Sequence, residues 1–527
     1  MQHYDIGIIG AGWSGLMASK YAIQQGFTVL ILEQEEHIGG VWKYSDSPNR
    51  ATVIKSTETT SSRSLTEISD FPMPDDYPHF PHHSQIYTYL ENYVKHFNLA
   101  EHIRWQAKVI KSEKKGNVWQ VYLEDGELYQ FNNLIVCAGL HQSPNDISQE
   151  KPFSNFTGKI IHSIAYKETL PEHQTKRILV VGGGETASDI SNELSLVSQE
   201  LYWSIRNGQW FINKWTPCYD RPFDEQNSFL ERLVSPVAHF NAFYGTWLQW
   251  LWGYNGHGIP VWRSQAGYMR QFVNKSSAVL EKIKDGKIFP KPGVANIQGR
   301  IVYFTDGTQT EIDIIILCTG YKPVLTFLPQ KYNYSSYERF LHIFDVEDPS
   351  IAFVGFVRPV IGSIPAIAEV QSKIIADVFA GNIILPNLAK RRKIAAKTAK
   401  KWRNYFRFTS QRIEGLVDIS VYMPILYKFA GLYWPIFRFA FKNLIRFWQT
   451  ITASYHGSFM LFNQKQYESY ILERFQFYQP SPDSLRYKII HGGWIVILLV
   501  NPMLTVYYYL KDFWHIITAP KDQILDK

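Results

Sequence analysis

Two glycine-rich segments, each between an apolar run and a helical pattern, constrain the fold of this chain more than any other feature. They occupy residues 5–15 and 177–187. Their motif positions are, in order, Gly10, Gly12 and Gly15, then Gly182, Gly184 and Ala187. This context is typical of a βαβ unit that binds a dinucleotide: the first glycine turns the chain, the second admits a pyrophosphate, and the third position packs helix on strand. The following helix, which begins at Glu185 and Thr186 in the second segment, presents N–H donors to the phosphates.

The residue at the end of the next strand differs between the two units and separates their ligands. A strand expected at residues 28–32 ends in Glu33, whereas one expected at residues 201–205 ends in Arg206. A carboxylate accepts a hydrogen bond from a free ribose hydroxyl but repels a 2′-phosphate, which the guanidinium suits, with Ser204 beside it. We therefore expect FAD, with NAD as the alternative, in the first unit and NADP in the second. A purely structural glycine turn is the competing interpretation of either loop.

Later apolar runs indicate that one unit is inserted in the other. A run at residues 133–138 ends at Gly139, and a run at residues 313–318 ends just before Gly320. Strands that end in this way place backbone at the edge of a sheet where ligands bind. The chain then returns to the first unit through residues 348–356. We expect an FAD domain at 1–168 and 320–388, an NADP domain with an aromatic insertion at 169–319, and a helical, basic and aromatic C-terminal extension at 389–527.

Cysteine usage and charge limit the compartment and the partners. Three widely spaced cysteines without a Cys-x-x-Cys fit a reducing compartment, and no signal peptide precedes the first strand. The segment from Lys390 to Arg446 contains fourteen basic residues and only two acidic ones, Glu414 and Asp418. Because the net charge of the whole chain is +7, the rest of the chain has a net charge of −5. A mildly acidic body argues against nucleic-acid binding. The histidines at residues 79–83 have no cysteine or clustered carboxylate beside them, so we expect no metal site.

Tryptophan is concentrated between the strands of the second unit. A packed aromatic subcore is favoured there over a substrate-lining role. The residues concerned are Trp210, Trp215, Trp247, Trp250, Trp252 and Trp262.

A further motif lies between the two glycine-rich loops. Residues 156–166 read Phe-x-Gly-x-x-x-His-x-x-x-Tyr. Other short motifs are GGVW at 39–42, DFPMPDDYP at 70–78, CTGY at 318–321, GSI at 362–364 and EVQ at 369–371. As an ordered set, these motifs resemble the flavin-containing monooxygenases, class B flavoprotein monooxygenases with two Rossmann-like domains, from residue 1 to about 375. Tyr166 stands where the related Baeyer–Villiger enzymes have Trp, which favours the heteroatom-oxidising branch.

The resemblance implies an activity of the N,N-dimethylaniline monooxygenase type. NADPH would reduce the flavin, O2 would be captured as a C4a-hydroperoxyflavin, and a small soft nucleophile, an amine nitrogen or a sulfide sulfur, would take one oxygen atom. Uncoupled NADPH oxidation and Baeyer–Villiger oxygenation of a carbonyl are the alternatives. A flavin disulfide reductase would need a paired-cysteine centre that the sequence lacks.

Several site residues follow from the same resemblance. Gly40 and Trp42 match a flavin-contacting motif, and Val109 is expected at the FAD site. Thr60 stands where the family usually places an Asn near the reactive flavin, so the amide's paired donor and acceptor are replaced by one hydroxyl. His162 is expected to order the hinge between the domains and to help hold NADP over the flavin. A structural histidine satisfied by backbone carbonyls is the alternative.

The C-terminal extension predicts contact with a membrane. Arg438, Lys442 and Arg446 recur every four residues among aromatic side chains, so residues 424–448 are expected to form a helix with one basic stripe. Residues 489–510 contain no charged side chain and are long enough to cross a bilayer, with a buried core segment as the alternative. We expect peripheral or monotopic attachment through residues 390–510, on the cytoplasmic side.

Overall fold

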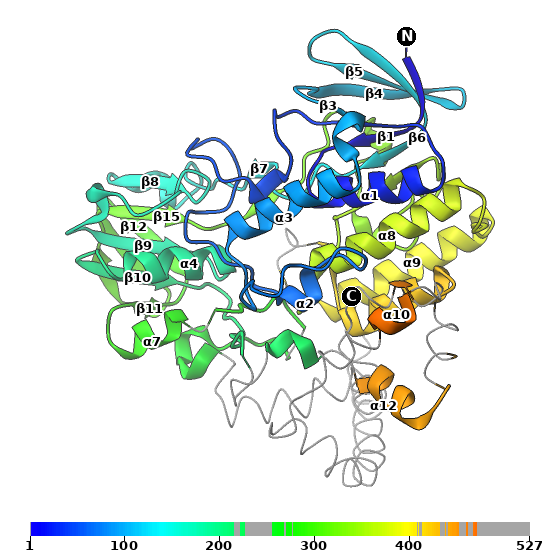
Figure 1. Ribbon diagram of the computed structural model, residues 1–527. Helices are drawn as coiled ribbons and strands as arrows, with labels where there is room; N and C mark the ends of the chain where they lie inside the picture. The colour runs from blue at the N-terminus through cyan, green and yellow to red at the C-terminus, as the bar shows by residue number, and fades with distance from the viewer. Residues whose placement is uncertain are drawn as a thin grey trace, which may run out of the picture.

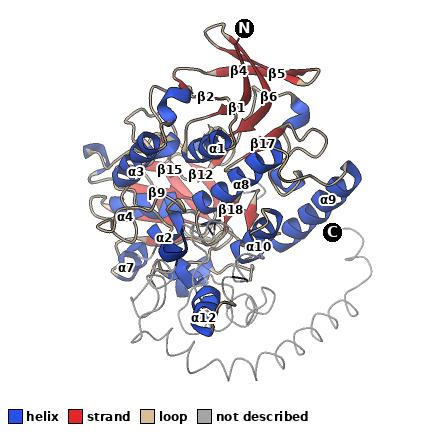
Figure 2. Cartoon of the chain, turned by 45° about the vertical axis from the view of Figure 1, so that its right-hand side comes forward, coloured by secondary structure: helices blue, strands red, loops and turns tan. Residues whose placement is uncertain are grey.

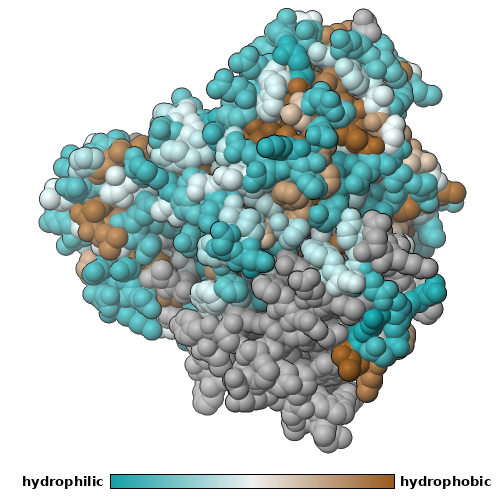
Figure 3. Space-filling model, in the orientation of Figure 1, coloured by the Kyte–Doolittle hydropathy of each residue, from teal (hydrophilic) through white to brown (hydrophobic). Residues whose placement is uncertain are grey.

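Two β-sheets, each covered by helices, organise the chain (Figure 1). The first is mixed, because β4 (Val109–Lys115) and β5 (Val118–Leu123) run antiparallel to their neighbours, and the second is parallel. The computed structural model describes residues 2–215, 222–226, 256–267, 270–276, 278–407, 409, 414–432, 438, 441–452, 460–461 and 467–471. The chain enters the first sheet, builds the second, and returns to the first, as the colours of Figure 1 show. Figure 2 shows the late strand β17 (Ile351–Phe353) beside the strands of the first sheet, where it pairs with β6 (Leu128–Val136). The expected α/β fold, with one nucleotide-binding unit inserted in the other, is confirmed. In the view of Figure 3 the described surface is mainly hydrophilic, in keeping with apolar side chains gathered inside.

The first sheet has seven strands in the order β3-β2-β1-β6-β5-β4, with β17 also paired to β6. The strands are β1 (Gln2–Ile9), β2 (Val29–Leu32), β3 (Ile103–Arg104), β4 (Val109–Lys115), β5 (Val118–Leu123), β6 (Leu128–Val136) and β17 (Ile351–Phe353). Its helices are α1 (Trp13–Gln24), α2 (Arg63–Thr66), α3 (His83–His96) and α8 (Ile364–Phe379). The β1–β2 pairing is parallel, with Ile6 opposite Val29, so the turn after β1 opens at the carboxyl edge of the sheet.

The second sheet has five strands in the order β11-β10-β9-β15-β8. They are β8 (Lys159–His162), β9 (Arg177–Val181), β10 (Glu200–Ser204), β11 (Phe289–Lys291) and β15 (Ile314–Leu317), with helices α4 (Glu185–Leu194) and α7 (Ala278–Lys284). An antiparallel sheet, β12 (Val294–Gln298), β13 (Ile301–Phe304) and β14 (Gln309–Glu311), and the pair β7 (Ser143–Pro144) and β16 (Tyr321–Lys322) complete this region. Strand β8 joins the second sheet through β15, although the expected boundary assigns it to the first unit.

The beginning of the C-terminal extension is part of the first unit. It contains α9 (Leu388–Tyr405), β19 (Leu416–Val417), α10 (Ile419–Phe429) and α12 (Leu444–Thr452). Ala395, Ala399 and Trp402 on α9 are buried in the same core as α1 and α8. Strand β19 pairs with β18 (Arg358–Pro359). The expected boundary at 388/389 therefore separates segments that share one core.

The expected basic stripe on one helix is not formed. Residues 441–443 interrupt the helical pattern, and Asn443 accepts a hydrogen bond from the Arg446 N–H at 2.7 Å, which starts α12 anew. Lys442 and Arg446 both form ion pairs with Glu468. In the described part of the chain, no helix is both long and apolar enough to cross a membrane. Residues 489–510 lie outside the described residues.

The described tryptophans of the aromatic insertion pack in different places. Trp210 and Trp262 are fully buried, and Trp262 lies edge-on to Trp203 with ring centroids 4.8 Å apart. Trp262 therefore forms part of an aromatic subcore in the second unit, as expected. Trp210 instead belongs to the core of the first unit, and Trp215 lies edge-on to His79 and Phe80, so these two do not share that subcore. Trp247, Trp250 and Trp252 lie outside the described residues.

Candidate functional site

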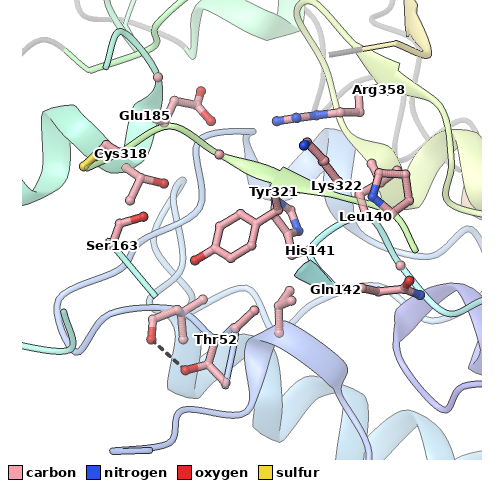
Figure 4. A pocket seen from close by; sticks show the side chains of 18 of the residues that line it. Thr52, Leu140, His141, Gln142, Ser163, Glu185, Cys318, Tyr321, Lys322 and Arg358 are labelled. Carbon is pink, nitrogen blue, oxygen red and sulfur yellow. Dashed lines mark hydrogen bonds between the residues drawn. The ribbon is translucent and has the colours of Figure 1, made fainter. Parts of the chain in front are cut away.

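Both glycine-rich loops open into one cavity of about 1840 Å³. The loop after β1 and the loop after β9 reach it from the two different sheets, and it continues along the segments that follow β6 and β15. Figure 4 shows part of its lining. Of the expected cofactor-binding residues, those that line it are Gly10, Gly12, Glu33, Gly40, Trp42, Val109, Gly182, Gly184, Glu185, Thr186, Ser204 and Arg206. A cavity that joins two dinucleotide loops has room for two coenzymes in contact.

The glycines of the two loops divide into two kinds. At Gly15 a Cβ would lie 1.9 Å from the Gly10 carbonyl oxygen, and at Gly182 it would lie 2.3 Å from the Cys318 oxygen, so the fold itself requires glycine there. Gly12 and Gly184, the N-cap residues of α1 and α4, have ordinary φ values of −72° and −83°. A Cβ would meet nothing nearer than 3.9 Å at Gly12 and nothing within 4 Å at Gly184.

This open space fits a dinucleotide cradle at each loop. Among the described residues, no atom forbids a side chain at the second glycine of either motif, so the space beside it is available to a ligand that approaches the backbone closely. The N–H groups at the start of α1 and α4 point at the same space, where a pyrophosphate would accept them. Ala187, the third position of the second motif, is buried and packs in the core of that unit.

Glu33 and Arg206 lie where the sequence places them, at the ends of their strands. Glu33 is buried, and its carboxylate accepts the Ala11 N–H at 2.6 Å and the Glu35 N–H at 3.0 Å. Burial raises the pKa of Glu33, and these hydrogen bonds oppose the shift. Arg206 is exposed on the cavity wall, and Gly293 leaves room for it, since a Cβ there would lie 3.2 Å from the Arg206 Cγ. The Ser204 hydroxyl donates to the Pro292 carbonyl at 2.6 Å.

Thr60 connects the two units inside the cavity. Its hydroxyl donates to the Glu185 carboxylate at 3.4 Å, and the Lys275 ammonium lies 3.9 Å from the other Glu185 oxygen. Trp42, the other site residue of this region, lies edge-on to Trp13 with ring centroids 6.4 Å apart. The first turn of α4 is thereby in contact with the segment that the family resemblance assigns to the flavin.

His162 stands behind the cavity wall and is not among its lining residues. Its Nε2 lies 3.2 Å from the Gly320 carbonyl oxygen, and its Nδ1 accepts the Ile164 N–H at 3.1 Å. The ring also lies edge-on to Tyr321, and burial lowers the pKa of His162. The chain crosses between the two units near residues 162 and 320. The contact of His162 with the Gly320 carbonyl therefore connects these two crossing segments.

Three polar residues of the site carry no motif in the sequence. Asn274 is fully buried, and its amide donates to the carbonyls of Gly183 at 3.3 Å and Gly184 at 3.1 Å, which braces the second loop. Asp189 lines the cavity, and burial raises its pKa to about 7. Arg358 enters the cavity from β18. Asn274 and Arg358 lie far in sequence from the glycine-rich loops, so only the fold brings them to this site, whereas Asp189 follows Gly184 by five residues on α4.

The described residues contain neither a cysteine pair nor a cluster that could bind a metal ion. Cys137 and Cys318 are buried and unpaired, and burial raises the pKa of both thiols. Cys218 lies outside the described residues. Within the same ranges, no three His, Cys, Asp or Glu side chains are grouped so as to hold a metal ion.

Comparison with known proteins agrees with this architecture. The family model described as flavin-binding monooxygenase-like matches residues 3–447. The chain is 31% identical over 449 residues to flavin-containing monooxygenase 3 of Homo sapiens, covering 81% of this chain and 82% of that protein. It is 30% identical over 440 residues to a 4-hydroxybenzoate brominase (decarboxylating) of Marinomonas mediterranea, covering 81% and 83%.

Solved structures share the fold at low sequence identity. The S-allyl-L-cysteine S-oxygenase of Allium sativum superimposes with a TM-score of 0.61 at 18% identity, over 90% of this chain and 98% of that one. An NADP⁺-bound cyclohexanone monooxygenase of Rhodococcus superimposes with a TM-score of 0.60 at 17% identity, over 82% and 98%. These likenesses concern the arrangement of the two nucleotide-binding units.

Proposed function

This chain belongs to the flavin-binding monooxygenase-like family, an NADPH-dependent enzyme family that uses FAD, and on that basis we propose that it oxygenates an amine nitrogen or a sulfide sulfur. The observation that carries the proposal is the single cavity into which both dinucleotide loops open. A hydride donor and a flavin held at these loops would share this one cavity. FAD, when bound, supplies the redox chemistry with O2, while the protein binds, orients and excludes water.

Each loop is assigned one coenzyme by the charge beside it. The loop after β1, with Glu33 at the end of β2, would hold the adenosine and pyrophosphate of FAD. The loop after β9, with Arg206 after β10, would hold NADP, because the exposed guanidinium can bind the 2′-phosphate with two parallel hydrogen bonds. Thr60 and Glu185 then lie between the two coenzymes, where their contact fixes the distance between the units.

A coupling assay tests the proposal. The FAD-loaded enzyme is given NADPH, O2 and either N,N-dimethylaniline or methyl phenyl sulfide, and NADPH consumption is compared with N-oxide or sulfoxide formed and with H2O2 released. We expect oxygenated product in near-stoichiometric yield with at least one of the two. NADPH consumption that appears entirely as H2O2 with both would refute the proposal in favour of an oxidase.

Two further arms separate the remaining alternatives. A cyclic ketone tests Baeyer–Villiger oxygenation, and lactone formation in place of N- or S-oxide would move the enzyme to that class. Bromide with 4-hydroxybenzoate tests the chemistry for which the Marinomonas relative is named. Brominated product with neither N-oxide nor sulfoxide would assign halogenation instead.

We also propose that α9 binds an anionic membrane surface. Lys390, Lys393, Lys397 and Lys400 are exposed and share one face of this helix, and none has a partner in the described part of the chain. Each lysine near such a surface contributes about 1 kcal/mol. Replacing the last three by Gln should lower partitioning onto phosphatidylserine-containing vesicles roughly 100-fold in a flotation assay.

Substitution is a cleaner test of this surface than truncation near residue 388, because a truncation would also remove the buried face of α9. Replacing Arg392, which is already paired with Glu347, by Gln is the matched control and should leave flotation nearly unchanged. Equal flotation of the triple variant and the parent would exclude α9 as the contact.

A further inference from the structure

Arg358 is a cation in the cavity that forms no ion pair with any residue the structure describes. It lies on β18, where its backbone N–H donates to the Gly415 carbonyl at 2.8 Å, and its guanidinium stacks 5.0 Å above the ring centroid of Phe272. The side chain lines the cavity and extends toward its middle, as does that of Lys322 (Figure 4). Within the described residues, neither cation forms an ion pair or a side-chain hydrogen bond.

The acidic groups of the cavity do not neutralise this cation. Burial lowers the pKa of Arg358, and the negative charge of Glu185 opposes this shift. Its two carboxylate oxygens, however, face Lys275 and the Thr60 hydroxyl. His141 adds no positive charge near neutral pH, because burial, and then Arg358, lower its pKa to about 4. Counting the described residues alone, the region around Arg358 and Lys322 therefore has more positive than negative charge.

A guanidinium that loses hydration without gaining a carboxylate is costly, and such groups are retained where a ligand completes the pair. The planar face of Arg358 is fixed by Phe272, which leaves its N–H edge free for two parallel hydrogen bonds to an anion. Lys322, on β16, would supply a second, more mobile positive charge to the same anion.

We propose that Arg358, assisted by Lys322, forms a subsite that binds a carboxylate group of the substrate. The substrate class is then narrower than a soft nucleophile: a sulfide or amine that carries an acidic group at a fixed distance from the atom to be oxygenated. This inference rests on the function proposed above. A phosphate group of NADP is the other source of an anion for the same two cations.

A matched pair of thioethers tests the subsite: 4-(methylthio)benzoate and its neutral amide, 4-(methylthio)benzamide. The FAD-loaded parent enzyme should prefer the acid by about 10- to 100-fold in kcat/KM, the range expected for charge-assisted hydrogen bonds. Arg358→Gln should abolish that preference by weakening the acid alone, and Arg358→Lys should keep part of it. The KM for NADPH and the flavin content should be unchanged in both variants.

Equilibrium binding separates failure of the subsite from failure of the proposed function. Binding of the acid to the FAD-loaded enzyme, followed by flavin absorbance without NADPH, should weaken 10- to 100-fold in Arg358→Gln and stay constant in the surface control Arg392→Gln. If the acid binds through Arg358 but neither thioether is oxygenated, the subsite stands and the function falls. If both thioethers are oxygenated and bound equally by parent and variant, the subsite is refuted. If the variant raises the KM for NADPH but leaves kcat/KM for both thioethers equal to that of the parent, Arg358 binds the coenzyme phosphate. That outcome also refutes the substrate subsite.

Discussion

Replacing Gly184 by Ala isolates the role of the second loop in coenzyme binding. The backbone there has φ −83° and ψ 175°, which alanine adopts without strain, and the added Cβ would meet no protein atom within 4 Å. Loss of the N-cap preference for glycine costs less than about 1 kcal/mol, and the smaller entropy of the unfolded chain returns a similar amount. The folded protein should therefore be as stable as the parent.

NADP binding should fall sharply in the same variant. If the pyrophosphate lies against this backbone, a methyl group displaces it by an ångström or more and lengthens about two charge-assisted hydrogen bonds. Each is worth about 1.5–3 kcal/mol, which together correspond to a loss of roughly 100- to 10,000-fold in affinity. The Kd for NADP⁺, measured by calorimetry on the FAD-loaded enzyme, should rise by that factor while the 450 nm flavin absorbance per protein stays constant.

Gly12→Ala should give the reciprocal result: a stable protein that has lost FAD and still binds NADP⁺. Gly267→Ala is the control, because that exposed glycine has no atom nearer its added Cβ than the Arg270 Cδ at 3.8 Å. Gly15→Ala should instead prevent folding, since its Cβ would lie 1.9 Å from a carbonyl oxygen. Normal NADP⁺ affinity in a folded Gly184→Ala protein would show that no phosphate lies at this loop.

Three further predictions concern charge and hydrogen bonding. Arg206→Glu should raise the KM for NADPH roughly 100-fold and leave that for NADH nearly constant, because only NADPH carries the 2′-phosphate; equal changes would contradict the assignment. Asn274→Ala should destabilise the fold by about 2–3 kcal/mol in urea unfolding and weaken NADP⁺ but not FAD, since two carbonyls of the second loop lose their buried donor. Burial raises the pKa of Glu369 to about 7, so the native state holds an extra proton between about pH 4.5 and 7 and stability is lost as pH rises through 7. Glu369→Gln should remove this pH dependence of the free energy of unfolding, which amounts to about 2 kcal/mol between pH 5.5 and 8.5 and is measured by melting curves at those two pH values. The surface control Glu347→Gln should keep it.

The fold could be predicted from the sequence where the local hydrophobic pattern agrees with the position that the strand takes in its sheet. The strand expected at residues 28–32 is β2, and the apolar run before Gly320 is β15. Strand β8 shows the limit: its four residues look like a continuation of the first unit, and only their pairing with β15, some 150 positions later, places them in the second sheet. The break before α12 is a different case, because Asn443 is a recognisable N-cap signal that a spacing of basic residues alone overlooks.

The site was predictable to the extent that it is made of loops with their own sequence pattern. Gly12, Gly184, Glu33 and Arg206 all reach the cavity, since a βαβ unit fixes their places within about thirty residues of chain. Arg358 reaches the same cavity, and the buried Asn274 braces the second loop through the carbonyls of Gly183 and Gly184. Both come from segments whose sequence pattern indicates no ligand. Their roles depend on tertiary neighbours, which spacing along the chain does not encode.

Acidic side chains of the inserted unit hold the segment that carries Thr60. Asp224 accepts the Ser62 N–H at 2.7 Å, and Glu225 accepts the Ser64 hydroxyl, while Thr60 itself donates to Glu185. Burial raises the pKa of Asp224 to about 6, so its hydrogen bond to Ser62 is charge-assisted only above that pH. Acidification through pH 6 therefore weakens a contact that sets Thr60 against the second loop. Because contacts between units of one chain are commonly polar and adjustable, the relation between the two nucleotide sites depends on the charge of these carboxyl groups as well as on the shape of either loop.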